Sequence, residues 1–110
     1  MTMPPGLPEH ELTLLIGIFQ AHPEVRGVTL FGSRAKGTHS PQSDIDLALL
    51  GDISALQAAT IAADLDELPL PYHYDVKAFS TITLSALREH IERAGIAIYM
   101  AAPIAAHSTP

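Results

Sequence analysis

Cysteine is absent from the 110 residues of this chain. The absence excludes disulfide bonds, zinc–thiolate sites, iron–sulfur clusters and thiol catalysis. Positive charge is also scarce, because 6 lysine and arginine residues stand against 12 acidic residues and the net charge is −6. This balance argues against a direct DNA or RNA substrate, which requires clustered basic side chains. A small nucleotide chelated to Mg²⁺ is compatible with the charge, since the metal ion is itself positive.

Long apolar runs are missing as well. The longest weakly polar stretch, residues 94–106, contains Gly95 and Pro103, and it falls short of the roughly 18–20 apolar residues that a membrane span requires. The N-terminus has no basic region followed by an apolar core, so we expect no signal peptide. These absences are compatible with a cytoplasmic location, which we expect. Hydrophobic residues still make up 47% of the chain, enough for one small domain with a core.

The apolar pattern predicts an alternation of helices and strands. Leu12, Leu15, Ile16 and Phe19 recur at helical spacing and predict an amphipathic helix. Ser54 and Gln57 form a capping-box pattern at the start of a later helix. We expect strands over residues 25–31, 44–50, 72–79 and, as a short final strand, 96–100, with helices beginning near residues 33, 54 and 84. The order predicts an α/β (α+β) fold over residues 9–100, with helices packed on a small mixed sheet, between tails at residues 1–8 and 101–110.

The most specific feature lies in residues 32–46. A Gly32-Ser33 turn follows a predicted strand, and after ten further residues comes the pair Asp44 and Asp46. Side chains two apart on a strand share a face, so the two carboxylates lie together. Hard oxygen ligands favour Mg²⁺ or Mn²⁺, and two such ions can align an attacking oxygen with a phosphate. Asp75, on a later predicted strand, is the best candidate for a third carboxylate.

The Gly32-Ser33 turn predicts an anion site. Glycine lets a ligand approach the backbone, and the first N–H groups of a following helix lack partners within that helix. The β- and γ-phosphates of a nucleotide would lie there, also held by the Ser33 hydroxyl, with the α-phosphate over the aspartate pair. Arg34 is a further candidate for phosphate contact, and a solvated helix face is its alternative. This arrangement predicts nucleotidyl transfer with pyrophosphate as the leaving group.

Three polar residues near these motifs have open roles. His39 lies in the loop between them and either meets a substrate or is simply exposed. His73 and Lys77 share the strand face of Asp75. We expect Lys77 to pair with a site carboxylate rather than to act in catalysis.

The motif resembles the DNA polymerase beta-like nucleotidyltransferase superfamily, whose pattern is Gly-Ser, ten residues, Asp-x-Asp and a third aspartate on a later strand. The runs Gly-Ser-Arg-Ala-Lys-Gly and Ser-Asp-Ile-Asp-Leu, with the segment at residues 87–93, are similar to the minimal nucleotidyltransferases of bacteria and archaea. The resemblance covers residues 9–100. It implies Mg²⁺-dependent transfer of a nucleoside monophosphate, AMP from ATP in some members, with Asp44 and Asp46 binding two ions. By the same resemblance, Asp75 binds one ion and helps to deprotonate the acceptor hydroxyl.

The resemblance also implies a partner. Family members of this size often act beside a helical protein of the HEPN class, and some are antitoxins that transfer AMP to a tyrosine of a HEPN toxin. After the catalytic core, little chain remains to form an acceptor pocket, so we expect another protein, or a second copy of this one, to provide it. Candidate contact residues are Ile96, Ile98, Tyr99 and Ile104, and the alternative for them is a final edge strand packed on the core.

Two other functions stay open from the sequence alone. The chain could be an antitoxin that blocks its partner by contact, with a vestigial site. It could also be an aminoglycoside-type adenylyltransferase whose substrate-binding subunit is a separate chain. The presence of the Gly-Ser turn and all three aspartates favours an enzyme, because a vestigial site commonly loses one of them.

Overall fold

The computed structural model describes residues 7–38, 40 and 42–102. Within this part of the chain, the strands are β1 (Gly27–Phe31), β2 (Ile45–Leu50), β3 (Tyr74–Ala78) and β4 (Ile96–Met100). The helices are α1 (Glu9–Gln20), α2 (Ser33–Lys36), α3 (Ala55–Asp66) and α4 (Ser85–Ala94), and a 3₁₀ turn, η1 (Phe79–Thr81), follows β3. All helices and strands expected from the sequence are present, and η1 is the addition.

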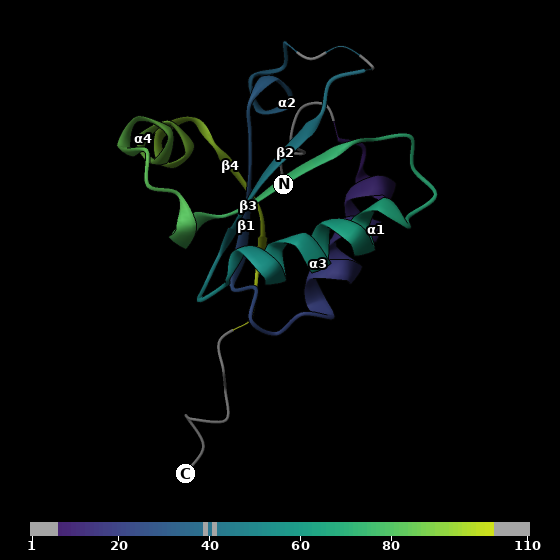
Figure 1. The fold of residues 1–110 in the computed structure, drawn as a ribbon. Coiled ribbons are helices and arrows are strands. Elements are labelled where there is room, and N and C mark those ends of the chain that lie inside the picture. Colours follow the sequence, from purple (N-terminus) through teal and green to yellow (C-terminus); the bar gives the residue numbers. More distant parts are fainter. Residues whose placement is uncertain (1–6, 39, 41, 103–110) are drawn as a thin grey trace.

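The strands form one mixed sheet in the order β3–β2–β1–β4 (Figure 1). The central strand β1 pairs antiparallel with both β2 and β4. Strands β2 and β3 run parallel, with α3 between them in the sequence, as a parallel pair requires. The predicted mixed sheet is therefore confirmed.

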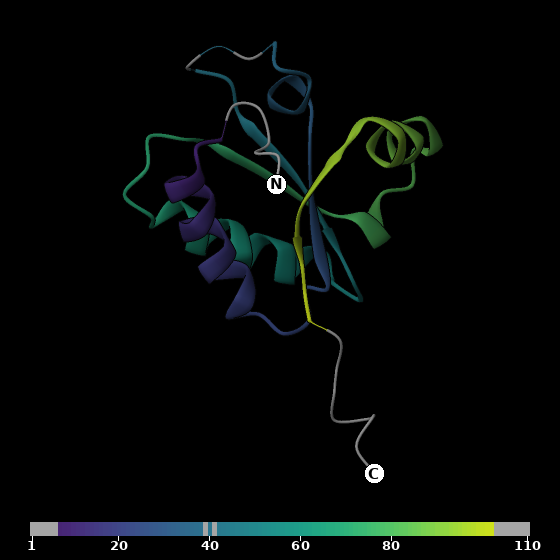
Figure 2. The ribbon, with the colours of Figure 1, turned by 180° about the vertical axis from the view of Figure 1, so that it is seen from behind.

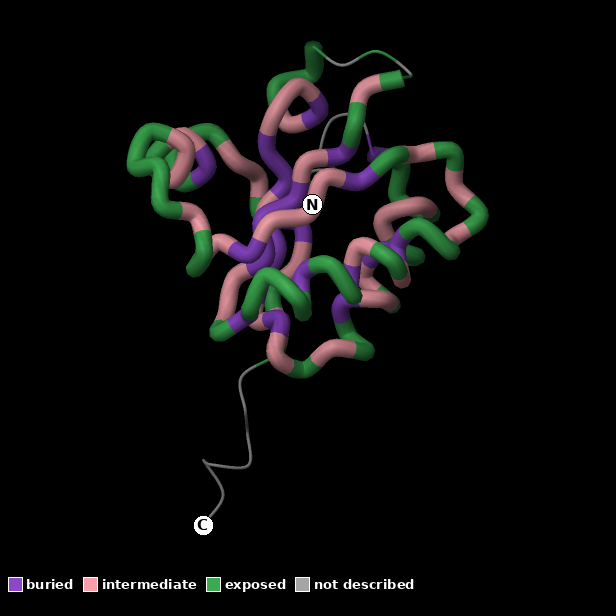
Figure 3. Tube along the Cα trace, viewed as in Figure 1, coloured by how far each residue is buried: buried purple, intermediate pink, exposed green. Residues whose placement is uncertain are grey.

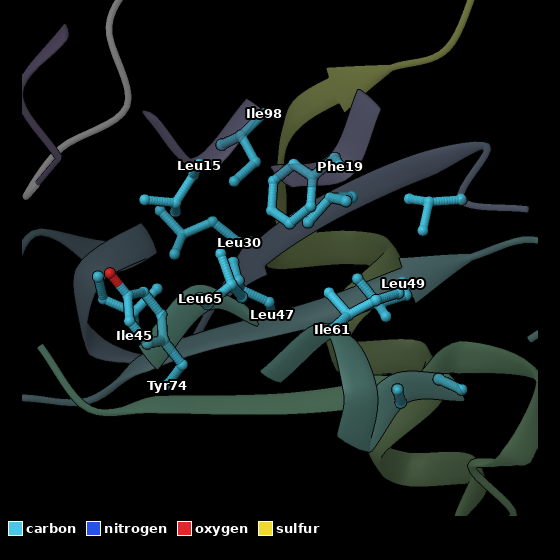
Figure 4. Close-up of a cluster of buried hydrophobic side chains, with 14 of the residues drawn as sticks. Leu15, Phe19, Leu30, Ile45, Leu47, Leu49, Ile61, Leu65, Tyr74 and Ile98 are labelled. Carbon is cyan, nitrogen blue, oxygen red and sulfur yellow. The ribbon is translucent and has the colours of Figure 1, made fainter. Parts of the chain in front are cut away.

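Helices lie on both faces of this sheet. Figures 1 and 2 show α1 and α3 together on one face, α4 on the opposite face and α2 at one end of the strands. The main core lies between the sheet and the α1–α3 layer and includes Leu15, Phe19, Leu30, Leu47 and Ile61 (Figure 4). Buried residues accordingly concentrate along the strands (Figure 3). A smaller cluster of Phe31, Ala48 and Ile91 lies under α4.

Strand alternation decides which face carries the polar residues. In β2, Ile45, Leu47 and Leu49 enter the main core. The residues between them, including Asp46 and Ala48, must point to the α4 side, and Ala48 does pack with Ile91 there. The carboxylate face predicted from the sequence is thus the α4 face of the sheet.

Local signals at helix ends have mixed outcomes. The capping box of Ser54 and Gln57 is present, with both reciprocal hydrogen bonds formed at 2.8 and 3.1 Å. In α2 the N-cap residue is Gly32, and Ser33 is already the first helical residue. The φ of Gly32 is 79°, a positive value that glycine adopts most easily. Leu7, within the predicted N-terminal tail, is buried in the main core.

The C-terminal apolar residues form an edge strand. Ile98 is buried, and Tyr99 packs against Phe19 with ring centroids 5.6 Å apart. The edge-strand alternative therefore accounts for the apolar residues of β4 better than a partner surface does. Ile104 lies outside the described residues. Every helix in the described ranges is too short or too polar to cross a membrane.

Candidate functional site

The turn between β1 and α2 packs directly against the motif aspartate that lies within β2. Phe31, the last residue of β1, is the register partner of Asp46. The chain then turns at Gly32, where an added Cβ atom would collide with Oδ2 of Asp46. Only a residue without a side chain leaves room for this carboxylate in its present position. The two halves of the sequence motif, although separated along the chain, therefore form one site.

The second neighbour of Asp46 is Asp75. Parallel pairing of β2 with β3 places these two residues in register, and both point to the α4 face by strand alternation. The sequence predicted a third carboxylate from a later strand, and the sheet brings it beside the pair. Asp75 remains well exposed, with 44% of its side-chain surface accessible.

Asp44 lies one step outside the sheet, just before β2. Its side chain is 52% exposed and lies 3.5 Å from Nδ1 of His73, the residue that precedes β3. Parallel register explains the pairing, since the Ile45 N–H group donates to the His73 carbonyl at 2.9 Å. The contact of His73 with Asp44 was not predicted, because it depends on this register rather than on spacing within one segment.

The electrostatics of the cluster centre on Asp46. Burial raises the pKa of its carboxyl above the ordinary value, and the nearby charges of Asp75 and Asp44 raise it further. Lys77 acts in the opposite direction and lowers that pKa. The three carboxylates thus repel one another, a situation that a divalent cation relieves.

Lys77 makes the contact expected from the sequence. It is two residues beyond Asp75 on the same face of β3, and its Nζ lies 3.3 Å from Oδ1 of Asp75. The ammonium group is therefore a cation already present beside the carboxylates.

The donor set fits a hard divalent cation. Carboxylate oxygens are the ligands that Mg²⁺ and Mn²⁺ prefer, and Asp46 and Asp75 are adjacent in the sheet. Across the described part of the chain, however, no three acidic or histidine side chains converge closely enough to hold a metal ion as they stand. Asp44 must turn inward to complete such a set, and its half-exposed side chain has room to do so.

Arg34 does not lie on a solvated helix face, which was one of the two environments considered for it. Its side chain is buried, and its guanidinium donates to the Ser43 carbonyl and stacks over the Tyr72 ring. Sequence reasoning missed Tyr72, because its contact with Arg34 joins segments far apart in the chain and leaves no local signal. His39, the other open candidate, lies outside the described residues.

The structure therefore brings Gly32, Asp46 and Asp75 together, with Ser33 next in the chain and Asp44 at the rim. The catalytic, nucleotide-binding and metal-binding roles assigned to these residues and to Arg34 remain predictions.

Comparison with known structures gives similar folds in toxin–antitoxin complexes. A chain of a toxin–antitoxin crystal structure with AMP-PNP is 22% identical, with a TM-score of 0.70, covering 82% of this chain and 73% of that one. A chain of the MntA–HepT toxin–antitoxin complex is 18% identical, with a TM-score of 0.65 and coverages of 86% and 74%.

A third similar chain belongs to the complex of a tri-AMPylated HEPN toxin from Shewanella oneidensis with its MNT antitoxin. It is 19% identical, with a TM-score of 0.62 and coverages of 82% and 70%. At these identities the likeness establishes the fold. A search of curated proteins gave no significant match.

The sequence profile of one family covers most of the chain. Residues 14–103 match the family described as "Polymerase beta, Nucleotidyltransferase". This range includes the Gly-Ser turn and all three aspartates. The chain therefore belongs to the polymerase beta nucleotidyltransferase family.

Proposed function

We propose that this chain transfers AMP from ATP to a hydroxyl group of a partner protein, specifically a tyrosine of a helical HEPN toxin that it thereby neutralises. The observation that carries the proposal is the packing of Gly32 against Asp46. It joins a turn suited to phosphate with a carboxylate suited to a metal ion. Asp75, in register with Asp46, adds a second carboxylate to the same face.

The proposed reaction is a displacement at the α-phosphorus of ATP. The acceptor oxygen forms a bond to that phosphorus, and the bond from phosphorus to the oxygen bridging to the β-phosphate breaks. Pyrophosphate leaves with the electron pair of the broken bond, and Asp75 accepts the proton of the acceptor hydroxyl. The turn at Gly32 and Ser33 holds the β- and γ-phosphates, which positions the α-phosphate near Asp46.

Asp44, Asp46 and Asp75 are the residues that would hold two Mg²⁺ ions, or Mn²⁺ in their place. When bound, such ions neutralise negative charge on the phosphate oxygens in the transition state. Burial raises the pKa of Asp46, and the charges of Asp75 and Asp44 raise it further. A bound cation would offset this unfavourable concentration of negative charge, which supports the assignment.

The choice of acceptor is supported by the structural neighbours. One of them is an MNT antitoxin complex whose HEPN toxin carries AMP groups, and another contains the ATP analogue AMP-PNP. The net charge of −6 supports a protein acceptor over a nucleic acid. A cytoplasmic location belongs to the same proposal, because the reaction consumes ATP.

The test combines this chain with a HEPN protein encoded beside its gene, Mg²⁺ and ATP. Mass spectrometry of the HEPN protein should show one or more additions of ~329 Da, the mass of a transferred AMP group, on tyrosine. An unmodified partner that is still inhibited tightly by both the wild-type chain and Asp44→Asn would favour an antitoxin acting by contact alone. Modification of an added aminoglycoside, with the partner unmodified, would favour the small-molecule enzyme.

A further inference from the structure

Arg34 is a charged side chain that this fold buries almost completely. Only 3% of the surface of Arg34 is exposed. Burying a guanidinium is costly unless its donors are satisfied. The contacts that compensate this cost therefore indicate what the residue does.

Two hydrogen bonds of Arg34 reach the residue before Asp44. The Nε and Nη2 atoms of Arg34 both donate to the Ser43 carbonyl at 3.1 Å, and Nη2 also reaches the Ser40 carbonyl at 3.5 Å. The guanidinium plane lies over the Tyr72 ring, 4.8 Å from its centroid. The Tyr72 hydroxyl in turn donates to Glu11 of α1. Arg34 thus links the loop before β2 to the layer of α1.

Asp44 is held between two fixed peptide groups. On its N-terminal side, the Ser43 carbonyl accepts hydrogen bonds from Nε and Nη2 of Arg34. On its C-terminal side, the Ile45 N–H group donates to the His73 carbonyl. Its own side chain is half exposed, and the His73 ring that it contacts at 3.5 Å is itself 79% exposed, so packing does little to orient it. The backbone direction at Ser43 consequently sets where the Asp44 carboxylate points.

We propose that Arg34 is a positioning residue for Asp44, acting through the Ser43 carbonyl, and is not itself a phosphate ligand. The inference rests on the proposed function, in which Asp44 is a metal ligand. Without these hydrogen bonds, the backbone at Ser43 samples more conformations, and Asp44 is less often placed where its side chain can turn inward towards Asp46. A planar guanidinium is required, because lysine cannot direct two donors from a rigid group at one carbonyl oxygen and also stack on a ring.

The test is Mn²⁺ binding in the absence of nucleotide, measured by electron paramagnetic resonance on the full chain. Arg34→Lys should weaken Mn²⁺ binding roughly 10-fold, the lower end of the effect of removing a residue that orients a metal ligand. Arg26→Lys is the matched control, since Arg26 also donates to a backbone carbonyl, that of Ala102 at 2.9 Å. It adjoins the opposite end of β1 and should leave Mn²⁺ affinity unchanged.

Two outcomes would overturn the inference. If Arg34 binds phosphate directly, Arg34→Lys weakens ATP binding while Mn²⁺ binding without nucleotide stays at the wild-type value. If Arg34 only stabilises the fold, its variant unfolds at a lower temperature and Mn²⁺ affinity, measured well below that temperature, does not change.

Two further variants complete the design. Should Arg34→Lys fail to fold, Tyr72→Leu removes the stacked ring while keeping Arg34, and a few-fold loss of Mn²⁺ affinity is expected. Unchanged affinity in a folded Tyr72→Leu would then count against the inference. Asp46→Asn distinguishes failure of the proposed function from failure of the role proposed for Arg34. If Asp46→Asn binds Mn²⁺ as tightly as the wild type does, the proposed function is wrong, and this inference is wrong with it.

Discussion

Gly32 has two independent reasons to lack a side chain. Its φ of 79° lies in the left-handed region, and a Cβ atom there would strike the Asp46 carboxylate. The sequence predicted only one constraint, an approach of phosphate to the backbone. Contact with Asp46 shows that the same residue also sets the space available to a proposed metal ligand.

Gly32→Ala should therefore weaken Mg-ATP binding by about 10-fold or more, because Asp46 must move away from its present position. The positive-φ backbone at this position, which is adopted almost only by glycine, adds a cost of about 1–3 kcal/mol in the free energy of unfolding. Gly17→Ala is the matched control, since a Cβ atom there meets nothing within 4 Å. It should leave ATP affinity unchanged and stabilise α1 by about 0.5–1 kcal/mol. Calorimetric titration of both variants gives the answer, and equal ATP affinities would place the triphosphate elsewhere.

Lys77 lowers the negative charge of the site before any metal ion binds. Its ammonium group lies 3.3 Å from Asp75 and lowers the pKa of Asp46. Because its positive charge already offsets part of the charge of the carboxylates, Lys77 competes with a divalent cation for them.

Lys77→Met should accordingly strengthen Mn²⁺ binding in the absence of nucleotide, by a few-fold, as expected for removal of one partly exposed charge. Arg93→Met removes one positive charge from α4, where Arg93 pairs with Glu89 on the surface, and should have little effect. Equal gains in the two variants would mean that net charge alone is responsible. A loss of affinity in Lys77→Met would show that Lys77 helps to build the site.

At the scale of elements, the two faces of β3 have different surroundings. Asp75 and Lys77 lie on the site face, while Tyr74 enters the main core on the other. The Tyr74 hydroxyl is buried and has no hydrogen-bond partner within the described residues. Burial, followed by the nearby charges of Tyr72, Asp66 and Glu11, raises the pKa of Tyr74 to about 12.

Tyr74→Phe should raise the free energy of unfolding at neutral pH by up to about 1 kcal/mol, because it removes an unsatisfied buried hydroxyl. Because the pKa of Tyr74 is higher in the folded chain than in the unfolded chain, ionisation of this tyrosine favours unfolding. The free energy of unfolding of the wild type is therefore unaffected by it below pH 10 and falls as the pH rises towards 12. At pH 11 the fall should be smaller in the variant by about 1 kcal/mol. Urea unfolding at pH 7 and pH 11 measures both effects, and AMP transfer should not change. A strongly destabilised Tyr74→Phe would show that the hydroxyl has a partner after all.

The elements themselves follow from local patterns. Helical spacing of Leu12, Leu15 and Phe19, and the capping box at Ser54, depend on residues within one or two turns of each other, and both predictions are confirmed. Strand alternation likewise predicts that Asp46 and Leu47 point to opposite faces of the sheet, and Leu47 does enter the main core.

The site's supporting contacts could not be predicted in the same way. The pairing of Asp44 with His73 requires the parallel register of β2 and β3, and the stacking of Arg34 on Tyr72 joins distant segments. No spacing rule encodes either contact. Arg34 therefore resembles a surface cation when only its neighbours in sequence are considered, whereas tertiary packing buries it.

At the scale of the whole molecule, the two faces of the sheet have different coverings. Helices α1 and α3 cover one face and enclose the main core, while α4 and a small cluster around Phe31, Ala48 and Ile91 cover part of the other (Figures 1 and 2). Asp44 and Asp75 remain about half exposed on that second face. An acceptor from another protein can therefore approach the carboxylates from solvent.

Parallel reactions with Mg²⁺, the proposed HEPN partner and ATP labelled at the α- or the γ-phosphate test whether the Gly-Ser turn and the three carboxylates form one site for nucleotidyl transfer. We expect α-label to reach the partner while γ-label leaves in pyrophosphate. We also expect Asp46→Asn to reduce transfer by roughly 100-fold or more, whereas Asp52→Asn, in the turn after β2, should not. Label transferred from the γ-phosphate, or near-normal transfer by Asp46→Asn, would show that these residues do not form such a site.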